Sequence, residues 1–174
     1  MRNIRSLAYC AICIALITVC AWVAIPFAVP FTLQTFAVFL SAAILGPRRV
    51  AAAVSAYILL GICGAPVFSG FSAGLQAIIG PTGGYLTGFI PAAAIAGSIA
   101  KGASLPRRIA GMCAGLMVCY VFGTAWFMRI YSGGTSLLPA LSACVFPFII
   151  PDIIKIILAA VISERLDKTL QDVR

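Results

Sequence analysis

Asp152 and Lys155 are the two ionisable residues in an otherwise apolar run, FPFIIPDIIKIILAAV, at residues 146–161. A carboxylate acceptor beside an ammonium donor can bind a neutral, polar cyclic group that carries N–H donors and a carbonyl acceptor. Lys155 could equally hold a substrate carboxylate. Because the lysine follows the acid by three positions, both side chains lie on one face of a helix. These two residues are therefore the first candidates for a binding site.

Pro151 is well placed to begin or kink the helix that carries this pair. Asp152 would then lie in a first turn, where free N–H groups and the positive end of the helix dipole favour a carboxylate. A second interpretation is a self-neutralising ion pair that only holds this helix to its neighbours. A buried pair is usually no more stabilising than apolar residues of the same volume, so structure alone gives weak reason for it.

The composition shows which solvent surrounds the pair. Of the 174 residues 63% are apolar and 9% are charged, against roughly 25% charged in a soluble domain. Such a chain has too few polar residues to form a solvated surface and belongs in a bilayer. Inserting a charged residue near mid-membrane costs at least about 2.5 kcal/mol of free energy, so such a residue is kept where it is paired, solvated or needed for function.

Apolar stretches long enough to cross a ~30 Å hydrocarbon core divide the chain into about six segments. The segments must be helical, because in lipid every backbone N–H and C=O has to be bonded within its segment. The first is expected to remain as a membrane helix and not to be cleaved as a secretory signal. One integral membrane domain over residues 1–174 is expected. The segments lie near residues 7–25, 33–47, 49–65, 81–100, 108–128 and 139–163.

Basic residues indicate the orientation, because cytoplasmic loops carry an excess of Lys and Arg. With a cytoplasmic N-terminus, ten of the twelve basic residues fall inside, while Arg129 falls outside and Lys155 lies within the membrane. The sequence therefore predicts an all-α membrane protein, a six-helix transmembrane bundle with both termini cytoplasmic. The ten residues are Arg2, Arg5, Arg48, Arg49, Lys101, Arg107, Arg108, Arg165, Lys168 and Arg174.

Two outer connections, residues 25–36 and 65–89, carry no charge and are rich in proline and glycine. Non-helical backbone at membrane depth is tolerated where protein buries it or where it lines a cavity. One interpretation is a re-entrant loop that plugs the bundle. The other is a lid and wall for a small ligand, with backbone groups supplying hydrogen bonds.

Several absences limit the chemistry. No stretch fits G-x-x-x-x-G-K-[ST], so the chain is not expected to hydrolyse ATP itself. The chain has no histidine, and three of its four acids lie near the C-terminus, so neither a metal site nor a catalytic carboxylate pair is expected. Cys10 and Cys13 form a C-x-x-C in the first segment, where cysteine is more often a small apolar residue than a redox group.

Several segments together resemble the BioY family, the biotin-binding S components of energy-coupling factor transporters. The string GPTGGYLTGF at residues 80–89 resembles the family signature. The segment PFIIPDIIKIILAA at residues 147–160 stands in the place of the family's Pro-Gly-Asp-Leu-Leu-Lys segment, with Ile150 and Pro151 before the acid. Two further stretches match, VPFTLQTFAVFLSAAILGPR at residues 29–48 and YILLGICGAPVFSGFSAG at residues 57–74.

The resemblance implies a multi-pass protein of the cytoplasmic membrane that binds biotin near the outer face under a loop. It would deliver biotin inward when docked on an energising module made of a transmembrane scaffold subunit and two ATPase subunits. It would not be an enzyme and would use no cofactor, since only its partners use ATP. Asp152 and Lys155 would address the ureido ring. The other implied site residues are Tyr85, with Thr82, Gly83 and Gly84 around it, and the closing loop Val67, Phe68, Ser69, Gly70 and Phe71.

Ala11 and Ala15 in the first segment resemble the small-xxx-small patch by which S components dock on the scaffold subunit. Ordinary close packing between membrane helices is the other interpretation of these two residues. Three alternatives to biotin uptake stay open at this point. They are an S component for another vitamin, a membrane enzyme that uses Lys155 as a base, and an assembly subunit that binds no ligand.

Overall fold

The computed structural model of the chain describes residues 2–26, 29–130 and 136–172. Arg174, one of the basic residues expected inside, lies outside these ranges, as does the side chain of Arg2. In chain order the elements are α1 (Arg2–Trp22), β1 (Ala24–Ile25), β2 (Phe31–Thr32), α2 (Gln34–Leu45), α3 (Pro47–Ile62), the 3₁₀ helix η1 (Ser69–Phe71), α4 (Gln76–Ile79), α5 (Gly83–Ala100), α6 (Leu105–Ile130), α7 (Leu137–Cys144), the 3₁₀ helix η2 (Phe146–Phe148) and α8 (Ile149–Asp172).

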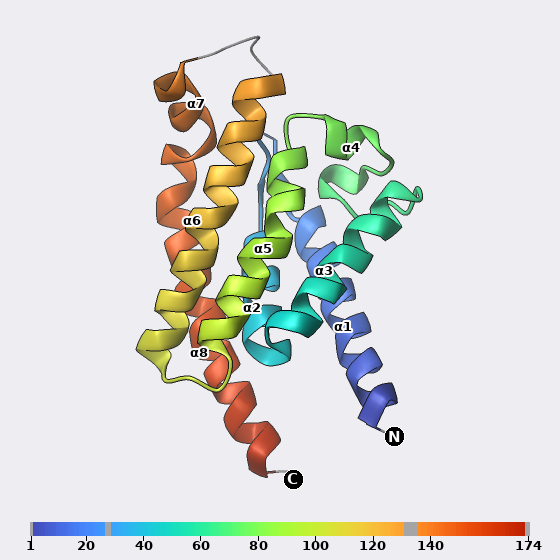
Figure 1. Ribbon diagram of the computed structural model, residues 1–174, viewed down its shortest axis with the longest axis vertical. Helices are drawn as coiled ribbons and strands as arrows, with labels where there is room; N and C mark the ends of the chain where they lie inside the picture. Colours follow the sequence, from blue (N-terminus) through green and yellow to red (C-terminus); the bar gives the residue numbers. More distant parts are fainter. Residues whose placement is uncertain (1, 27–28, 131–135, 173–174) are drawn as a thin grey trace.

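The chain is an almost entirely helical bundle, as the apolar segments predict (Figure 1). Four stretches of the described residues are long and apolar enough to cross a membrane: Ile4–Trp22, Gly83–Ala100, Leu105–Ile130 and Leu137–Thr169. The 12 residues of α2 rise only about 18 Å, which is less than the hydrocarbon thickness. The second and third expected segments therefore form a pair of shorter helices, α2 and α3, joined at Gly46.

The last expected segment, residues 139–163, is not one continuous helix. It divides into α7 and α8, with the 3₁₀ turn η2 between them. Pro147 lies in this turn and has no N–H to donate, so the helix of α7 cannot run through it. The break starts α8 at Ile149 and leaves Asp152 in its first turn.

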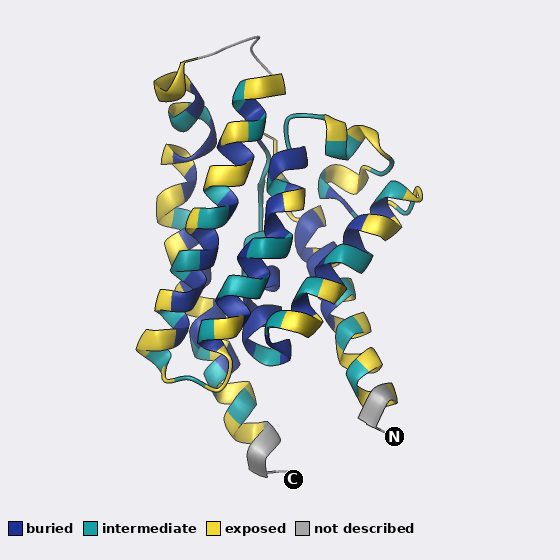
Figure 2. Cartoon of the chain, in the orientation of Figure 1, coloured by how far each residue is buried: buried dark blue, intermediate teal, exposed yellow. Residues whose placement is uncertain are grey.

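Glycines let α5 and α6 approach closely along the centre of the bundle. A Cβ at Gly84 would lie 2.2 Å from Cβ of Trp126, and one at Gly115 would lie 2.6 Å from the Ala92 carbonyl oxygen. Small residues at such contacts maximise van der Waals packing between membrane helices. The buried residues of the bundle gather at this interface and around α2 (Figure 2).

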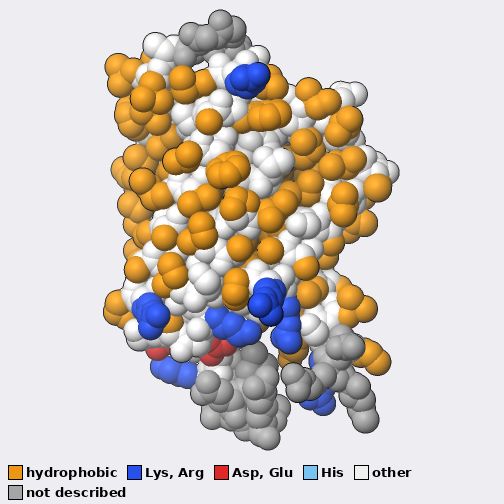
Figure 3. Space-filling model, viewed as in Figure 1, with side chains coloured by type: hydrophobic (Ala, Val, Ile, Leu, Met, Phe, Trp, Pro, Cys, Tyr) orange, Lys and Arg blue, Asp and Glu red, His pale blue; other side chains and the backbone are white. Residues whose placement is uncertain are grey.

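Both termini lie at one end of the molecule (Figure 1). Lys and Arg side chains gather at that end, and large apolar side chains cover the face above it (Figure 3). Ile150 on α8 is 73% exposed and Met117 on α6 is 65% exposed. An apolar band of this kind is the surface that faces lipid.

Irregular segments occupy the opposite half of the molecule (Figure 1). The strands β1 and β2 pair antiparallel and are together called the hairpin here, with Ala24 opposite Thr32 and Ile25 opposite Phe31. Residues 66–72, named the cover loop here, include η1. Trp22 at the end of α1 anchors this loop, because its Nε1 donates to the Pro66 carbonyl oxygen at 2.8 Å and its ring stacks on Phe71 with centroids 4.8 Å apart.

Candidate functional site

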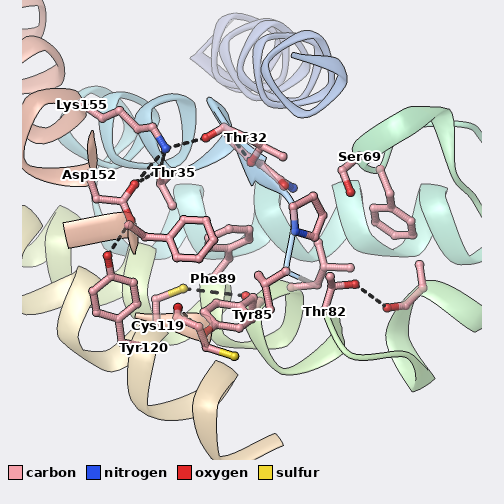
Figure 4. A pocket seen from close by; sticks show the side chains of 18 of the residues that line it. Thr32, Thr35, Ser69, Thr82, Tyr85, Phe89, Cys119, Tyr120, Asp152 and Lys155 are labelled. Atoms are coloured by element: carbon pink, nitrogen blue, oxygen red, sulfur yellow. Dashed lines mark hydrogen bonds and ion pairs between the residues drawn. The ribbon is translucent and has the colours of Figure 1, made fainter. Parts of the chain in front are cut away.

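A pocket lies within this half, between the first turn of α8, the start of α2, the helices α5 and α6, and the cover loop (Figure 4). Its volume is about 70 Å³, well below the roughly 300 Å³ at which small-molecule sites begin. A ligand larger than a few waters therefore requires the walls to move. The lining residues are Val29, Pro30, Thr32, Gln34, Thr35, Phe68, Ser69, Ser72, Ala77, Thr82, Tyr85, Leu86, Phe89, Cys119, Tyr120, Cys144, Phe148, Asp152 and Lys155.

The Asp152 carboxylate accepts hydrogen bonds on both of its oxygens. Oδ1 accepts from Lys155 Nζ at 2.9 Å and from Thr35 Oγ1 at 3.1 Å. Oδ2 accepts from the Tyr120 hydroxyl at 2.7 Å. The residue is only 4% exposed, and these three donors stabilise a charge that the membrane alone would not tolerate.

The Lys155 ammonium is satisfied in the same network. Nζ donates to the Thr32 carbonyl oxygen at 2.5 Å and to Thr35 Oγ1 at 3.3 Å, besides its bond to Asp152. It also lies 4.0 Å from the centroid of the Phe31 ring, a cation–π arrangement. The pair thus joins α8 to α2 and to β2.

Short-range sequence features place these groups. Strand β2 ends at Thr32, whose Oγ1 accepts from the Gln34 N–H at 3.2 Å as α2 begins. This turn exposes the Thr32 carbonyl toward Lys155 and puts Thr35 in the first turn of α2. On the opposite wall, the Tyr85 hydroxyl donates to the Cys144 carbonyl oxygen at 3.0 Å, which ties α5 to the end of α7.

The residues expected from the signature string divide between the pocket and the packing around it. Thr82 and Tyr85 line the pocket. Gly83 and Gly84 lie in close contacts beside it, because a Cβ at Gly83 would lie 1.7 Å from the Ile78 carbonyl oxygen and one at Gly84 would meet Trp126. The two glycines let α5 begin against α4 and α6.

The cover loop is likewise divided. Phe68 and Ser69 line the pocket, and Phe68 is 1% exposed. The Val67 carbonyl oxygen accepts from the Tyr57 hydroxyl at 2.8 Å, outside the lining. Gly70 has a positive φ of 64°, a conformation that glycine adopts without strain. Phe71 is 61% exposed and contacts Trp22.

Ala11 and Ala15 do not line the pocket and lie on an outward face of α1. Both are exposed, whereas Cys13 and Ile17 on the inner face are buried. The two alanines therefore present a small-residue face to the surroundings of the bundle.

Sequence reasoning missed Thr35 and Tyr120, although both hydrogen-bond the acid. They lie 117 and 32 positions from Asp152 in the chain, and neither carries a charge that would stand out in an apolar segment. The signal available for Thr35 was its place at the end of the charge-free connection 25–36. For Tyr120 the sequence offered only a hydroxyl in the middle of an expected helix.

The arrangement is suited to a neutral polar ligand. The carboxylate has roughly four lone-pair sites and three are used, so Oδ2 retains capacity for an N–H donor. Among the described residues no cluster of three or more His, Cys, Asp or Glu could hold a metal ion.

Comparison with known proteins gives consistent results. A family model described as the BioY family matches residues 1–172. The biotin transporter BioY of Thermotoga maritima is 44% identical over 166 residues, which cover 94% of this chain and 96% of the relative. The biotin transporter BioY2 of Lactococcus lactis is 36% identical, with 98% of this chain and 95% of the relative covered.

A solved structure is also similar. It is the crystal structure of an S-component for biotin from an ECF-type ABC transporter. The TM-score is 0.86 and the sequence identity is 26%, with 96% of this chain and 93% of that chain covered.

Proposed function

The chain belongs to the BioY family, and we propose from this membership and from the pocket that Asp152 and Lys155 form the polar end of its biotin site. It is a multi-pass membrane protein and the biotin-binding, substrate-specific subunit of an energy-coupling factor transporter. Biotin is the transported ligand and not a cofactor, and the chain is a transport subunit and not an enzyme.

The observation that carries the proposal is the buried network of Asp152, Lys155, Thr35 and Tyr120. The ureido ring of biotin has two N–H donors and one carbonyl acceptor, which complement a carboxylate and an ammonium side by side. Asp152 accepts from the ring and Lys155 donates to it. Thr35 and Tyr120, which already contact the carboxylate, hold it in place.

The remaining predicted residues form the walls in this proposal. Tyr85 and Thr82 border the ring or the chain of the ligand, and the backbone at Gly83 and Gly84 sets where α5 begins. Residues Val67–Phe71 close over biotin after it enters. The small volume of the pocket, about 70 Å³, supports such a movement, since biotin does not fit until the cover loop or the hairpin shifts.

We further propose that the end holding both termini is cytoplasmic. The basic side chains gathered there support this orientation under the positive-inside rule (Figure 3). The cover loop then opens to the outside, where biotin is captured. The membrane is the cytoplasmic membrane, and residues 1–174 form a single membrane domain.

The partner in transport is an energy-coupling module, for which we propose one transmembrane scaffold subunit and two ATPase subunits. Ala11 and Ala15, exposed on α1, would let a scaffold helix approach closely. Ala15→Trp should keep biotin binding but lose co-purification with the module. The same substitution at Ala110, exposed on α6, is the matched control. Full retention of the module by Ala15→Trp would remove α1 as the docking face.

Radiolabelled biotin binding to the purified protein tests the function directly. Bound label should be displaced by excess unlabelled biotin and not by other vitamins at the same concentration. Displacement by another vitamin alone would assign the chain to a different substrate. A folded sample that binds none of them would refute the proposed site.

A further inference from the structure

A second hollow lies between α6 on one side and α7 with the start of α8 on the other. It is an open groove with a volume of about 600 Å³. Tyr120 is the residue that lines both this groove and the biotin pocket. Representative lining residues are Met117, Val121 and Ala125 of α6, Leu137 and Leu141 of α7, and Ile153 of α8.

The groove is lined almost entirely by apolar groups. Its hydroxyl-bearing residues are Tyr120, whose hydroxyl donates to Asp152, and Thr124, which is 5% exposed. A polar solute would find few partners in this groove and would lose its hydration on entry. A hydrocarbon chain has no such loss.

The groove opens on the apolar outer surface of the bundle and follows α6. Its lining on α6 runs from Cys113 to Met128, which is about 22 Å at 1.5 Å per residue. One leaflet contributes about 15 Å of hydrocarbon, so an acyl chain can lie along the groove. Val121 is 64% exposed and Leu137 is 57% exposed, so the groove can be entered from the side.

A cation flanks the groove at its end away from the termini. Arg129 lies in the last turn of α6, four residues beyond Ala125, and so follows it on the helix face. It is exposed and forms no salt bridge within the part of the chain that the structure describes. Its guanidinium can form paired hydrogen bonds with a phosphate.

We propose that this groove binds a phospholipid, with one acyl chain between α6 and the α7–α8 pair and the lipid phosphate on Arg129. This inference goes beyond biotin uptake and depends only on the position of the chain in a membrane. The apolar groove matches an acyl chain, and the cation at its end matches a phosphate, so the two together favour a phospholipid. The outward helix faces of a second copy of the chain are apolar and would leave the cation without an anion.

Mass spectrometry of the intact protein in detergent tests the proposal, using phosphatidylglycerol and diacylglycerol with the same acyl chains. The wild-type protein should retain one phosphatidylglycerol under activation that strips other lipids. Ala125→Trp fills the groove and should lower the retained fraction at least about tenfold, equivalent to 1.4 kcal/mol. Ala110→Trp, the same change at an exposed site on α6 outside the groove, should retain the lipid.

The phosphate contact is tested separately. Arg129→Gln should remove the preference for phosphatidylglycerol over diacylglycerol, while Arg107→Gln, an exposed arginine at the other end of α6, should keep it. Val121→Trp replaces Ala125→Trp if that variant does not elute as a single species. Biotin binding by the same samples separates this proposal from the transport function, since the groove variants should still bind biotin.

Three results would overturn the lipid site. These are a wild-type protein that retains neither lipid, equal lipid retention by Ala125→Trp and Ala110→Trp, and loss of a second copy of the chain, in place of a lipid, from Ala125→Trp.

Discussion

Helix α8 takes part in two ion pairs that contain a buried cation, one near each of its ends, and they differ in what surrounds them; its third ion pair, Glu164–Lys168, is more exposed. Asp152 and Lys155 lie three positions apart on α8, and both line the proposed biotin pocket. Asp167 pairs across helices with Arg108 of α6 at 2.5 Å. Arg108 also donates to the Ala103 carbonyl oxygen at 2.7 Å and to Ser163 Oγ at 3.1 Å.

The difference is the basis for proposing that the first pair binds a ligand and that the second is structural. Arg108 is 3% exposed, but its donors end on backbone and on side chains that tie α6 to α8. The groups bonded to Asp152 border a cavity, from which a ligand can reach the carboxylate. Both pairs contain buried charge, so burial does not distinguish them. The pocket beside Asp152 and Lys155 is the feature that does.

The largest expected effect is on the pocket pair. Asp152→Asn replaces an acceptor with an amide that presents a donor to the Lys155 ammonium, and Lys155→Met deletes the ammonium. Each leaves a buried partner unpaired, a loss above about 2 kcal/mol, so biotin affinity should fall at least roughly thirtyfold. Isothermal titration measures it. Asp167→Asn is the matched control at the other pair and should bind biotin normally.

The double variant distinguishes a ligand site from a purely structural pair. Asp152→Asn combined with Lys155→Met removes both charges, so a structural pair would recover folding and binding together. We expect a monodisperse protein that does not bind biotin. Near-normal affinity in this variant would remove the pair from the ligand site.

A smaller effect is expected at Tyr120. Tyr120→Phe removes the donor to Asp152 Oδ2 and keeps the ring that separates the pocket from the lipid groove. The loss of one hydrogen bond near the ligand should lower affinity by about 1 kcal/mol, or roughly fivefold. Tyr57→Phe, which loses a hydroxyl bonded to the Val67 carbonyl oxygen, should change affinity less. Equal effects of the two variants would mean that Tyr120 does not position the carboxylate.

The smallest effect on biotin is expected at the second pair. Arg108→Met leaves Asp167 without its partner, and because the Asp167 side chain is 25% exposed, water compensates in part. The stability loss should be about 1–2 kcal/mol, seen as a lower melting temperature in detergent with affinity unchanged. A large loss of affinity in a folded sample would contradict the division between the two pairs.

The helical bundle and the ion pair were predictable from sequence because hydrocarbon imposes strong constraints. Long apolar segments must be helices, and two charges within such a segment must have partners. The three-residue spacing was enough to place Asp152 and Lys155 together. The end of α2 at Leu45 has a local signal, because Gly46, Pro47 and two arginines follow it, and the second and third segments were expected to be short or closely joined. The end of α3 at Ile62 has a weaker signal, since apolar residues continue beyond it.

The rest of the site depends on contacts between distant segments. Thr35 contacts Asp152 only because the hairpin turns the chain into α2 beside α8, and no local pattern encodes that approach. Gly83 and Gly84 stand out in the sequence, but their contacts with Ile78 and Trp126 are properties of helix packing. One segment was expected over residues 139–163, with Pro151 beginning or kinking its helix; the break lies instead at Pro147, and Pro151 lies within the first turn of α8.

The tie between α1 and the cover loop has a consequence for spectroscopy. The chain has two tryptophans, and both contact the segment that joins α3 to α5: Trp22 through Pro66 and Phe71, and Trp126 through a 3.0 Å hydrogen bond to the Gly80 carbonyl oxygen. Indole emission depends on the polarity and hydrogen bonding of its surroundings. The intrinsic fluorescence of the native protein is therefore a label-free optical reporter of the segment that we propose to shift when biotin enters.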